Sequence, residues 1–116
     1  MPIKGIANAS RNSVSGLRDA WGERAFRLEA IAAALLVPIA VCLPVTPVEK
    51  ALLVATVLLV LLVELLNSAV EAAVDRISLE RHELSRRAKD LGSAAVMVAL
   101  LLCAFVWAAV LLPLVA

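Results

Sequence analysis

The chain has 116 residues, of which 63% are hydrophobic and 18% are charged, and its mean hydropathy is +0.97. A soluble domain is usually about 45–50% apolar and about 25% charged, so this composition nearly excludes a soluble globular fold. The net charge of +1 gives no basic excess that would indicate a nucleic acid partner. Cys42 and Cys103 lie in apolar stretches, without the spacing of a metal site.

The N-terminal segment, residues 3–25, is predicted to be an amphipathic helix that lies on the membrane surface. On a helical projection its apolar side chains gather on one side: Ile3, Ile6, Val14, Leu17 and Trp21. A basic stripe with seven-residue spacing adjoins them: Lys4, Arg11 and Arg18. Such a helix either anchors the chain or also closes over a site at the cytoplasmic surface, and the pattern leaves both interpretations open.

Three further segments, residues 28–46, 48–77 and 83–115, are apolar enough to cross the hydrocarbon core as helices, for which roughly 20 residues suffice. Pro44 and Pro47 mark the end of the first segment. The second is long enough to extend beyond the bilayer on the cytoplasmic side. The sequence therefore predicts a single all-α membrane domain over residues 1–116, with a surface helix followed by three transmembrane helices.

Lysine and arginine are distributed very unevenly around these spans, and this asymmetry predicts the orientation. Of the 11 basic residues, only Lys50 lies in the connection between the first and second spans. The others precede the first span or lie between the second and the third. Because basic residues stay on the cytoplasmic side, we expect the N-terminus in the cytoplasm and the C-terminus in the periplasm.

A row of polar side chains runs along the second span, where the bilayer disfavours them. Its members share one helix face: Glu64, Asn67, Ser68, Glu71 and Asp75. A carboxylate inside a membrane helix is costly, so this face is expected to contact protein or water rather than lipid. Hydrogen bonding between helices is the plain explanation, and Asp75 beside Arg76 also fits an ordinary charged helix end. For Glu64 a functional role is the preferred interpretation.

Further polar residues are expected near the same membrane depth: Glu23, Glu29, Lys89, Asp90 and Ser93. Carboxylates bind Mg²⁺ through oxygen, a lysine neutralises phosphate, and a remaining carboxylate can accept the proton of an alcohol. The residues thus suit a membrane phosphotransferase with Glu64 as base, and the four glycines form neither a P-loop nor a protein-kinase loop. A proton or cation path in a small oligomeric transporter is the alternative.

Two long motifs closely resemble the prokaryotic diacylglycerol kinase family: VELLNSAVEAAVDRI at 63–77 and HELSRRAKDLGSAAV at 82–96. The similarity extends to SGLRDAW at 15–21 and RAFRLE at 24–29, and so covers most of the chain. The resemblance implies a surface helix, three transmembrane helices and a homotrimer. It also implies phosphorylation of diacylglycerol with ATP and Mg²⁺ in the bacterial inner membrane.

The resemblance also implies a role for each matching residue. Glu64 corresponds to the general base that takes the proton of the diacylglycerol hydroxyl group, with Asn67 beside it, and Glu23 and Glu71 correspond to the pair that binds Mg²⁺. The implied ATP-binding residues are Glu23, Glu71, Glu80, Arg81, His82, Lys89, Asp90 and, where some relatives carry tyrosine, Asn12. The implied lipid-binding residues are Arg18, Trp21, Glu64 and Ser93.

The chain departs from the family pattern at Arg86, where relatives often carry glycine, and at Lys4, which stands in for an N-terminal arginine. Some members of the family phosphorylate undecaprenol, a long polyprenol, instead of diacylglycerol. The motif details here are closer to the branch that uses diacylglycerol, and undecaprenol is the alternative substrate.

Overall fold

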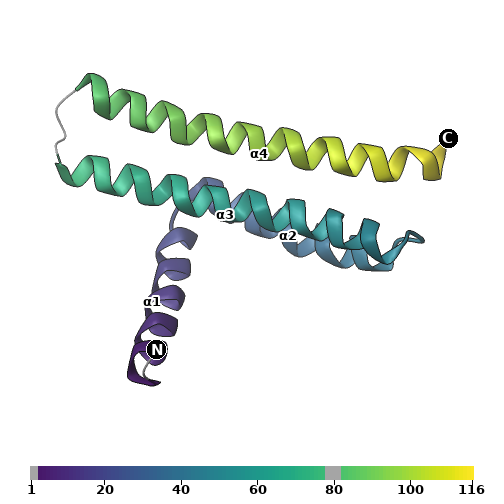
Figure 1. Ribbon diagram of the computed structural model, residues 1–116, viewed down its shortest axis with the longest axis horizontal. Helices are drawn as coiled ribbons and strands as arrows, with labels where there is room; N and C mark the ends of the chain where they lie inside the picture. The colour runs from purple at the N-terminus through teal and green to yellow at the C-terminus, as the bar shows by residue number, and fades with distance from the viewer. Residues whose placement is uncertain (1–2, 78–81) are drawn as a thin grey trace.

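The computed structural model describes residues 3–77 and 82–116, and these form four helices. They are α1 (Ile3–Trp21), α2 (Arg24–Cys42), α3 (Pro47–Ile77) and α4 (Glu83–Val115). Figure 1 shows α2, α3 and α4 running side by side along the long axis, while α1 leaves them at a steep angle. Each of α2, α3 and α4 is long and apolar enough to cross a membrane, which confirms the prediction of an all-α fold with three such helices.

The surface helix and the first span meet at a corner that the sequence did not predict. Helix α1 ends at Trp21 rather than at residue 25, and α2 begins at residue 24 rather than 28. Gly22 and Glu23 turn the chain, with their backbone N–H groups donating to the carbonyls of Asp19 and Ala20 at 3.1 and 2.9 Å. The corner places the Glu23 carboxylate where α1 meets the helical bundle.

The connection between α2 and α3 is short and carries its own helix signals. Helix α2 ends at Cys42 rather than at residue 46, just before Pro44. Thr46 and Glu49 then form a capping box: the backbone N–H of Thr46 donates to the Glu49 carboxylate at 3.0 Å, and the Glu49 N–H donates to the Thr46 hydroxyl at 3.2 Å. Pro47 occupies the first helical position of α3, where its missing N–H costs nothing.

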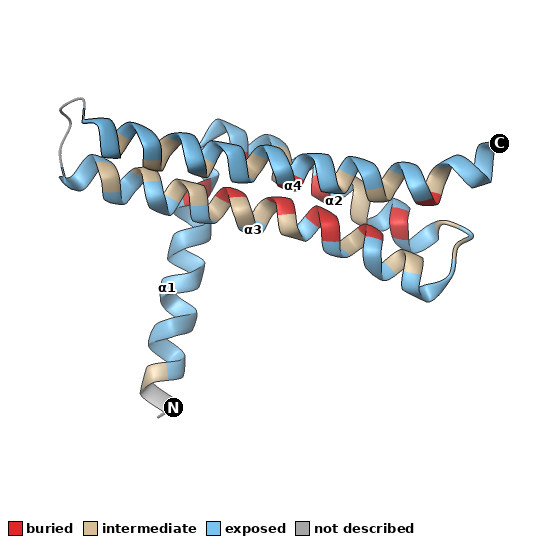
Figure 2. Ribbon diagram, turned by 45° about the horizontal axis from the view of Figure 1, so that its top comes forward, coloured by how far each residue is buried: buried red, intermediate tan, exposed pale blue. Residues whose placement is uncertain are grey.

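Helix α3 is the centre of the fold, since it packs against both α2 and α4. A small core lies toward the end of the bundle away from α1, where Ala40, Leu53 and Val110 meet and the Trp107 indole N–H donates to the Leu53 carbonyl at 3.2 Å. Figure 2 shows that buried residues follow the seams between the helices, whereas most of each outer face is exposed. These exposed faces are largely apolar, as expected for surfaces that face lipid or another subunit.

Candidate active site

Glu64 is the most deeply placed carboxylic acid in the described part of the chain. It lies on α3 with 6% of its surface exposed, and it is close to Glu29 on α2. Glu23 and Glu71 are close enough to act on Glu64 electrostatically. The fold therefore brings Glu23, Glu29 and Glu71 into the neighbourhood of Glu64.

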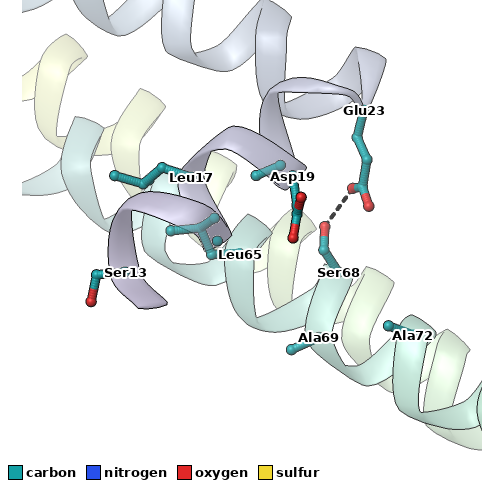
Figure 3. A pocket seen from close by; sticks show the side chains of 10 residues that line it. Ser13, Leu17, Asp19, Glu23, Leu65, Ser68, Ala69 and Ala72 are labelled. Carbon is teal, nitrogen blue, oxygen red and sulfur yellow. Dashed lines mark hydrogen bonds between the residues drawn. The ribbon is translucent and has the colours of Figure 1, made fainter. Parts of the chain in front are cut away.

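Glu23 reaches this group from the corner between α1 and α2. Its carboxylate accepts a hydrogen bond from the Ser68 hydroxyl on α3 at 2.5 Å, which Figure 3 shows at the edge of a cleft. Ser68 shares the polar face of α3, but sequence reasoning assigned it no role in the site. The bond fixes one carboxylate oxygen of Glu23 against the second span.

Asn67 and Glu71 form the next pair along the same face of α3. The Asn67 amide donates to the Glu71 carboxylate at 3.5 Å. On the other side of Asn67 lies Gly92 of α4, where an added Cβ would collide with the Asn67 amide oxygen. That oxygen is buried and has no hydrogen-bond partner among the described residues. Gly92 thus lets α4 approach closely enough to shape the surroundings of Asn67.

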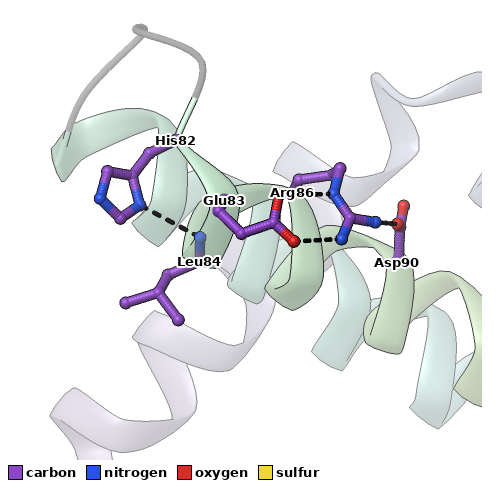
Figure 4. A network of polar contacts seen from close by, with 5 residues as sticks. All are labelled: His82, Glu83, Leu84, Arg86 and Asp90. Atoms are coloured by element: carbon purple, nitrogen blue, oxygen red, sulfur yellow. Dashed lines mark hydrogen bonds and ion pairs between the residues drawn. The ribbon is translucent and has the colours of Figure 1, made fainter.

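Charged residues of the N-terminal end of α4 are held by ion pairs. The Lys89 ammonium lies 2.8 Å from the Asp75 carboxylate of α3. Arg86 pairs with Asp90 at 2.7 Å and also with Glu83 within α4, as Figure 4 shows. Lys89 and Asp90, both predicted to contact the nucleotide, therefore already have partners of opposite charge.

His82 caps α4 and is exposed beside these pairs. Its ring nitrogen Nδ1 accepts a hydrogen bond from the Leu84 backbone N–H at 3.1 Å. Glu80 and Arg81, which are also predicted to bind ATP, lie outside the described residues. The predicted lipid-binding side chains are spread out: Arg18 and Trp21 are exposed on α1, as is Asn12, whereas Ser93 is exposed on α4.

A cleft of about 550 Å³ lies between α1 and α3. Figure 3 shows Asp19, Glu23 and Ser68 at one side of the cleft and Ser13 at the other, and the rest of the lining is apolar or small. The lining side chains include Ser13, Leu17, Asp19, Glu23, Leu65 and Ser68. It is an open cleft next to one of the four clustered carboxylates, which is the form expected of a site for an amphipathic ligand.

The carboxylates of this site are possible oxygen ligands for Mg²⁺. No group of three or more His, Cys, Asp or Glu side chains is arranged around one metal position in residues 3–77 and 82–116. Mg²⁺ needs no such cage, because one or two carboxylates with substrate phosphates and water complete its shell. Glu23 and Glu71 each use one oxygen in a hydrogen bond and offer hard oxygen ligands, so these residues fit the ion.

Comparison with known proteins places the chain among close relatives. Residues 11–111 match the profile of a family described as prokaryotic diacylglycerol kinase. The diacylglycerol kinase of Pseudomonas aeruginosa is 51% identical over 111 residues, which cover 95% of this chain and 90% of the relative. That of Escherichia coli K12 is 52% identical over 103 residues, covering 88% and 84%. That of Haemophilus influenzae is 49% identical over 107 residues, covering 91% of each chain.

Proposed function

Since the chain belongs to the prokaryotic diacylglycerol kinase family, we propose that it phosphorylates diacylglycerol with ATP. The γ-phosphoryl group passes directly to the lipid hydroxyl group, and phosphatidic acid and ADP are the products. The observation that carries this proposal is the gathering of Glu23, Glu64 and Glu71 next to an open cleft, with Lys89 nearby.

Glu64 acts as the general base. As the hydroxyl oxygen of the lipid forms its bond to the γ-phosphorus, Glu64 takes the hydroxyl proton, and the bond from phosphorus to the β,γ-bridging oxygen breaks. Burial of Glu64 supports this role, because a base shielded from water is available to the lipid hydroxyl group instead. Glu29, which lies close to Glu64, orients its carboxyl group.

Glu23 and Glu71 would hold Mg²⁺ together with the phosphates of ATP. When bound, the ion neutralises charge that builds up on the phosphate oxygens during transfer. The Ser68 hydroxyl and the Asn67 amide orient the two carboxylates, so that the corner between α1 and α2 and the second span would contribute one ligand each.

The nucleotide approaches from the cytoplasmic side, where Lys89, Asp90 and His82 lie at the start of α4. The Lys89 ammonium offsets phosphate charge, since it has three N–H donors and one bond to Asp75 uses only part of them. The lipid enters from the side of the bilayer. Its glycerol part occupies the cleft between α1 and α3, and its acyl chains remain in the membrane.

The active protein is a homotrimer in the bacterial inner membrane, with its N-terminus in the cytoplasm and its C-terminus in the periplasm. Large exposed apolar side chains along all three spans support burial in lipid and against neighbouring subunits. The distribution of Lys and Arg supports the orientation, because it brings the carboxylate cluster to the side where ATP is available.

The test is transfer of labelled γ-phosphate from MgATP to lipid in mixed micelles, with diacylglycerol and undecaprenol compared side by side. We expect label in phosphatidic acid at a rate well above that of undecaprenol phosphorylation. Preferential labelling of undecaprenol would change the substrate. No label in either lipid, with folded protein that binds MgATP, would refute the kinase function.

A further inference from the structure

The ion pair between Asp75 and Lys89 differs from the other ion pairs at this end of the molecule. The pairs of Arg86 lie within α4, whereas the Asp75–Lys89 pair joins the C-terminal turns of α3 to the N-terminal turns of α4 at 2.8 Å. Both side chains are about half exposed. Sequence reasoning left Asp75 between a structural and a functional role, and the proposed mechanism gives it none.

Asp75 has a competitor for the same lysine. Glu71 lies one helical turn earlier on the same face of α3, and it is close enough to act on Lys89 electrostatically. The lysine therefore lies between two carboxylates and contacts the one farther from Asn67. A flexible ammonium group that lost Asp75 would move to the remaining carboxylate, because Glu71 is then the nearest opposite charge.

We propose that Asp75 is a positioning residue that keeps the Lys89 ammonium off the Glu71 carboxylate. This positioning role rests on the proposed function. It leaves Glu71 available to a divalent cation and Lys89 available to the nucleotide phosphates. Asp75 acts through Lys89 and touches neither substrate. The contact between Asp75 and Lys89 also fixes the distance between the Lys89 ammonium and the Glu71 carboxylate, which come from two different helices.

Without the Asp75 carboxylate, the Lys89 ammonium and the metal ion would compete for the Glu71 carboxylate. In Asp75→Asn the amide no longer attracts the ammonium, so Lys89 pairs with Glu71 and the divalent cation has to displace it. We expect the affinity for the cation, in the presence of ATP analogue, to fall by about three- to tenfold, as for loss of a partly exposed, charge-assisted contact. Asp75→Glu keeps the charge and should restore most of the affinity.

The experiment measures Mn²⁺ binding by electron paramagnetic resonance, with a non-hydrolysable ATP analogue and the purified full-length protein in detergent micelles. Asp75→Asn is compared with Glu83→Gln, which removes a carboxylate partner of Arg86 at a similar place but within α4. The expected result is weaker Mn²⁺ binding in Asp75→Asn and unchanged binding in Glu83→Gln. Equal affinity in wild type and Asp75→Asn, or an equal loss in both variants, overturns the proposal.

A double-mutant cycle shows whether Asp75 works through the lysine. In a Lys89→Ala background no ammonium can move to Glu71, so adding Asp75→Asn should leave Mn²⁺ affinity unchanged. A further loss there means that Asp75 acts on its own and refutes the positioning role. Wild-type protein that binds Mn²⁺ as expected but transfers no phosphate to lipid refutes only the proposed function, since these binding measurements require no turnover.

Discussion

Glu64 combines deep burial with a polar partner, and that combination decides what its replacement does. A carboxylate in the middle of a membrane helix costs roughly 2.5–3.5 kcal/mol on insertion scales. Its neighbour on α2 is Glu29, a second carboxylic acid rather than a base that could pair with it. The fold should therefore tolerate glutamine at position 64, because its amide is neutral and has the same shape. The amide cannot, however, accept the proton of the substrate hydroxyl group.

The first prediction follows from this contrast. Glu64→Gln is expected to lower phosphoryl transfer about 10²–10⁴-fold, or ~3–5 kcal/mol at the transition state, while folding and MgATP binding stay near wild type. The measurement is the initial rate in mixed micelles together with thermal unfolding. Glu49→Gln, at the opposite end of α3, is the control and should retain normal turnover. More than about a tenth of wild-type turnover in Glu64→Gln would contradict the general-base role.

A second prediction separates the metal ligands from the base. Glu23→Gln and Glu71→Gln should each raise the Mg²⁺ concentration needed for half-maximal activity, because an amide oxygen is a weaker ligand than a carboxylate. A titration of rate against Mg²⁺ at fixed ATP measures the effect. Ser68→Ala, which removes the donor to Glu23, should shift the titration in the same direction by a smaller factor. Unchanged Mg²⁺ dependence in both glutamine variants would assign the two residues to structure.

At the level of helices, the approach of α4 to α3 depends on one position without a side chain. A Cβ at Gly92 would overlap the Asn67 amide oxygen and come within 3.2 Å of its Cγ. The third prediction is that Gly92→Ala turns the Asn67 amide away and so breaks its bond to Glu71. We expect a loss of about 1–3 kcal/mol in stability, as for overpacking in a core, accompanied by lower activity.

A double variant distinguishes that collision from a general effect on α4. If the clash with Asn67 causes the loss of stability, Asn67→Ala removes the obstacle, and Gly92→Ala should then cost much less in that background. Thermal unfolding of the four proteins in the same detergent measures the coupling. Equal costs in both backgrounds would show that Gly92 is needed for another reason.

The helices differ in how much of them the sequence predicted. The polar face of α3 followed from spacing alone, since side chains three, four and seven positions apart share a face whatever surrounds the helix. The partners on other helices did not follow: Glu29 beside Glu64, or Lys89 beside Asp75, depends on how far the spans slide along one another. The corner at Gly22 and Glu23 was missed, although Gly22 directly follows the last apolar residue of the pattern, Trp21, and glycine at that place is a signal that ends helices.

On the scale of the whole molecule, the single chain buries little of its apolar surface. Within the most apolar windows of α2, α3 and α4, 17%, 28% and 11% of residues are buried. The small residues Ala72, Ala73 and Ala95 are exposed near the polar site, as expected for surfaces where membrane helices of another subunit pack closely. The composition indicated a membrane chain, but any self-association that would cover these faces is a property of several copies.

The fourth prediction is therefore a trimer. Native mass spectrometry of the active protein in detergent should give the mass of three chains, and dilution into harsh detergent should abolish activity together with that species. Activity and trimer content are measured on the same samples. A monomer with full activity would contradict the assembly, and it would show that one chain completes the site by itself.

The fifth prediction concerns orientation, which decides whether the carboxylate cluster meets ATP. Basic side chains are expensive to move across the bilayer, and all but Lys50 lie on α1, in the first turn of α2, or between the last turn of α3 and the first two turns of α4. Cys42 is exposed at the end of α2 away from α1, whereas Leu84 is 64% exposed at the opposite end of the bundle. In intact cells, a membrane-impermeant maleimide should label Cys42 in a Cys103→Ala protein.

The matched variant reports the other side of the membrane. Leu84→Cys, made in a chain with Cys42→Ala and Cys103→Ala, should be labelled only after the cells are permeabilised. Residues 42 and 84 lie at opposite ends of three spans that run side by side (Figure 1). The orientation predicted from the basic residues therefore explains both labelling results. The reverse labelling pattern would place Lys89 and the clustered glutamates in the periplasm, where ATP is absent, and a cytoplasmic kinase reaction would then be impossible.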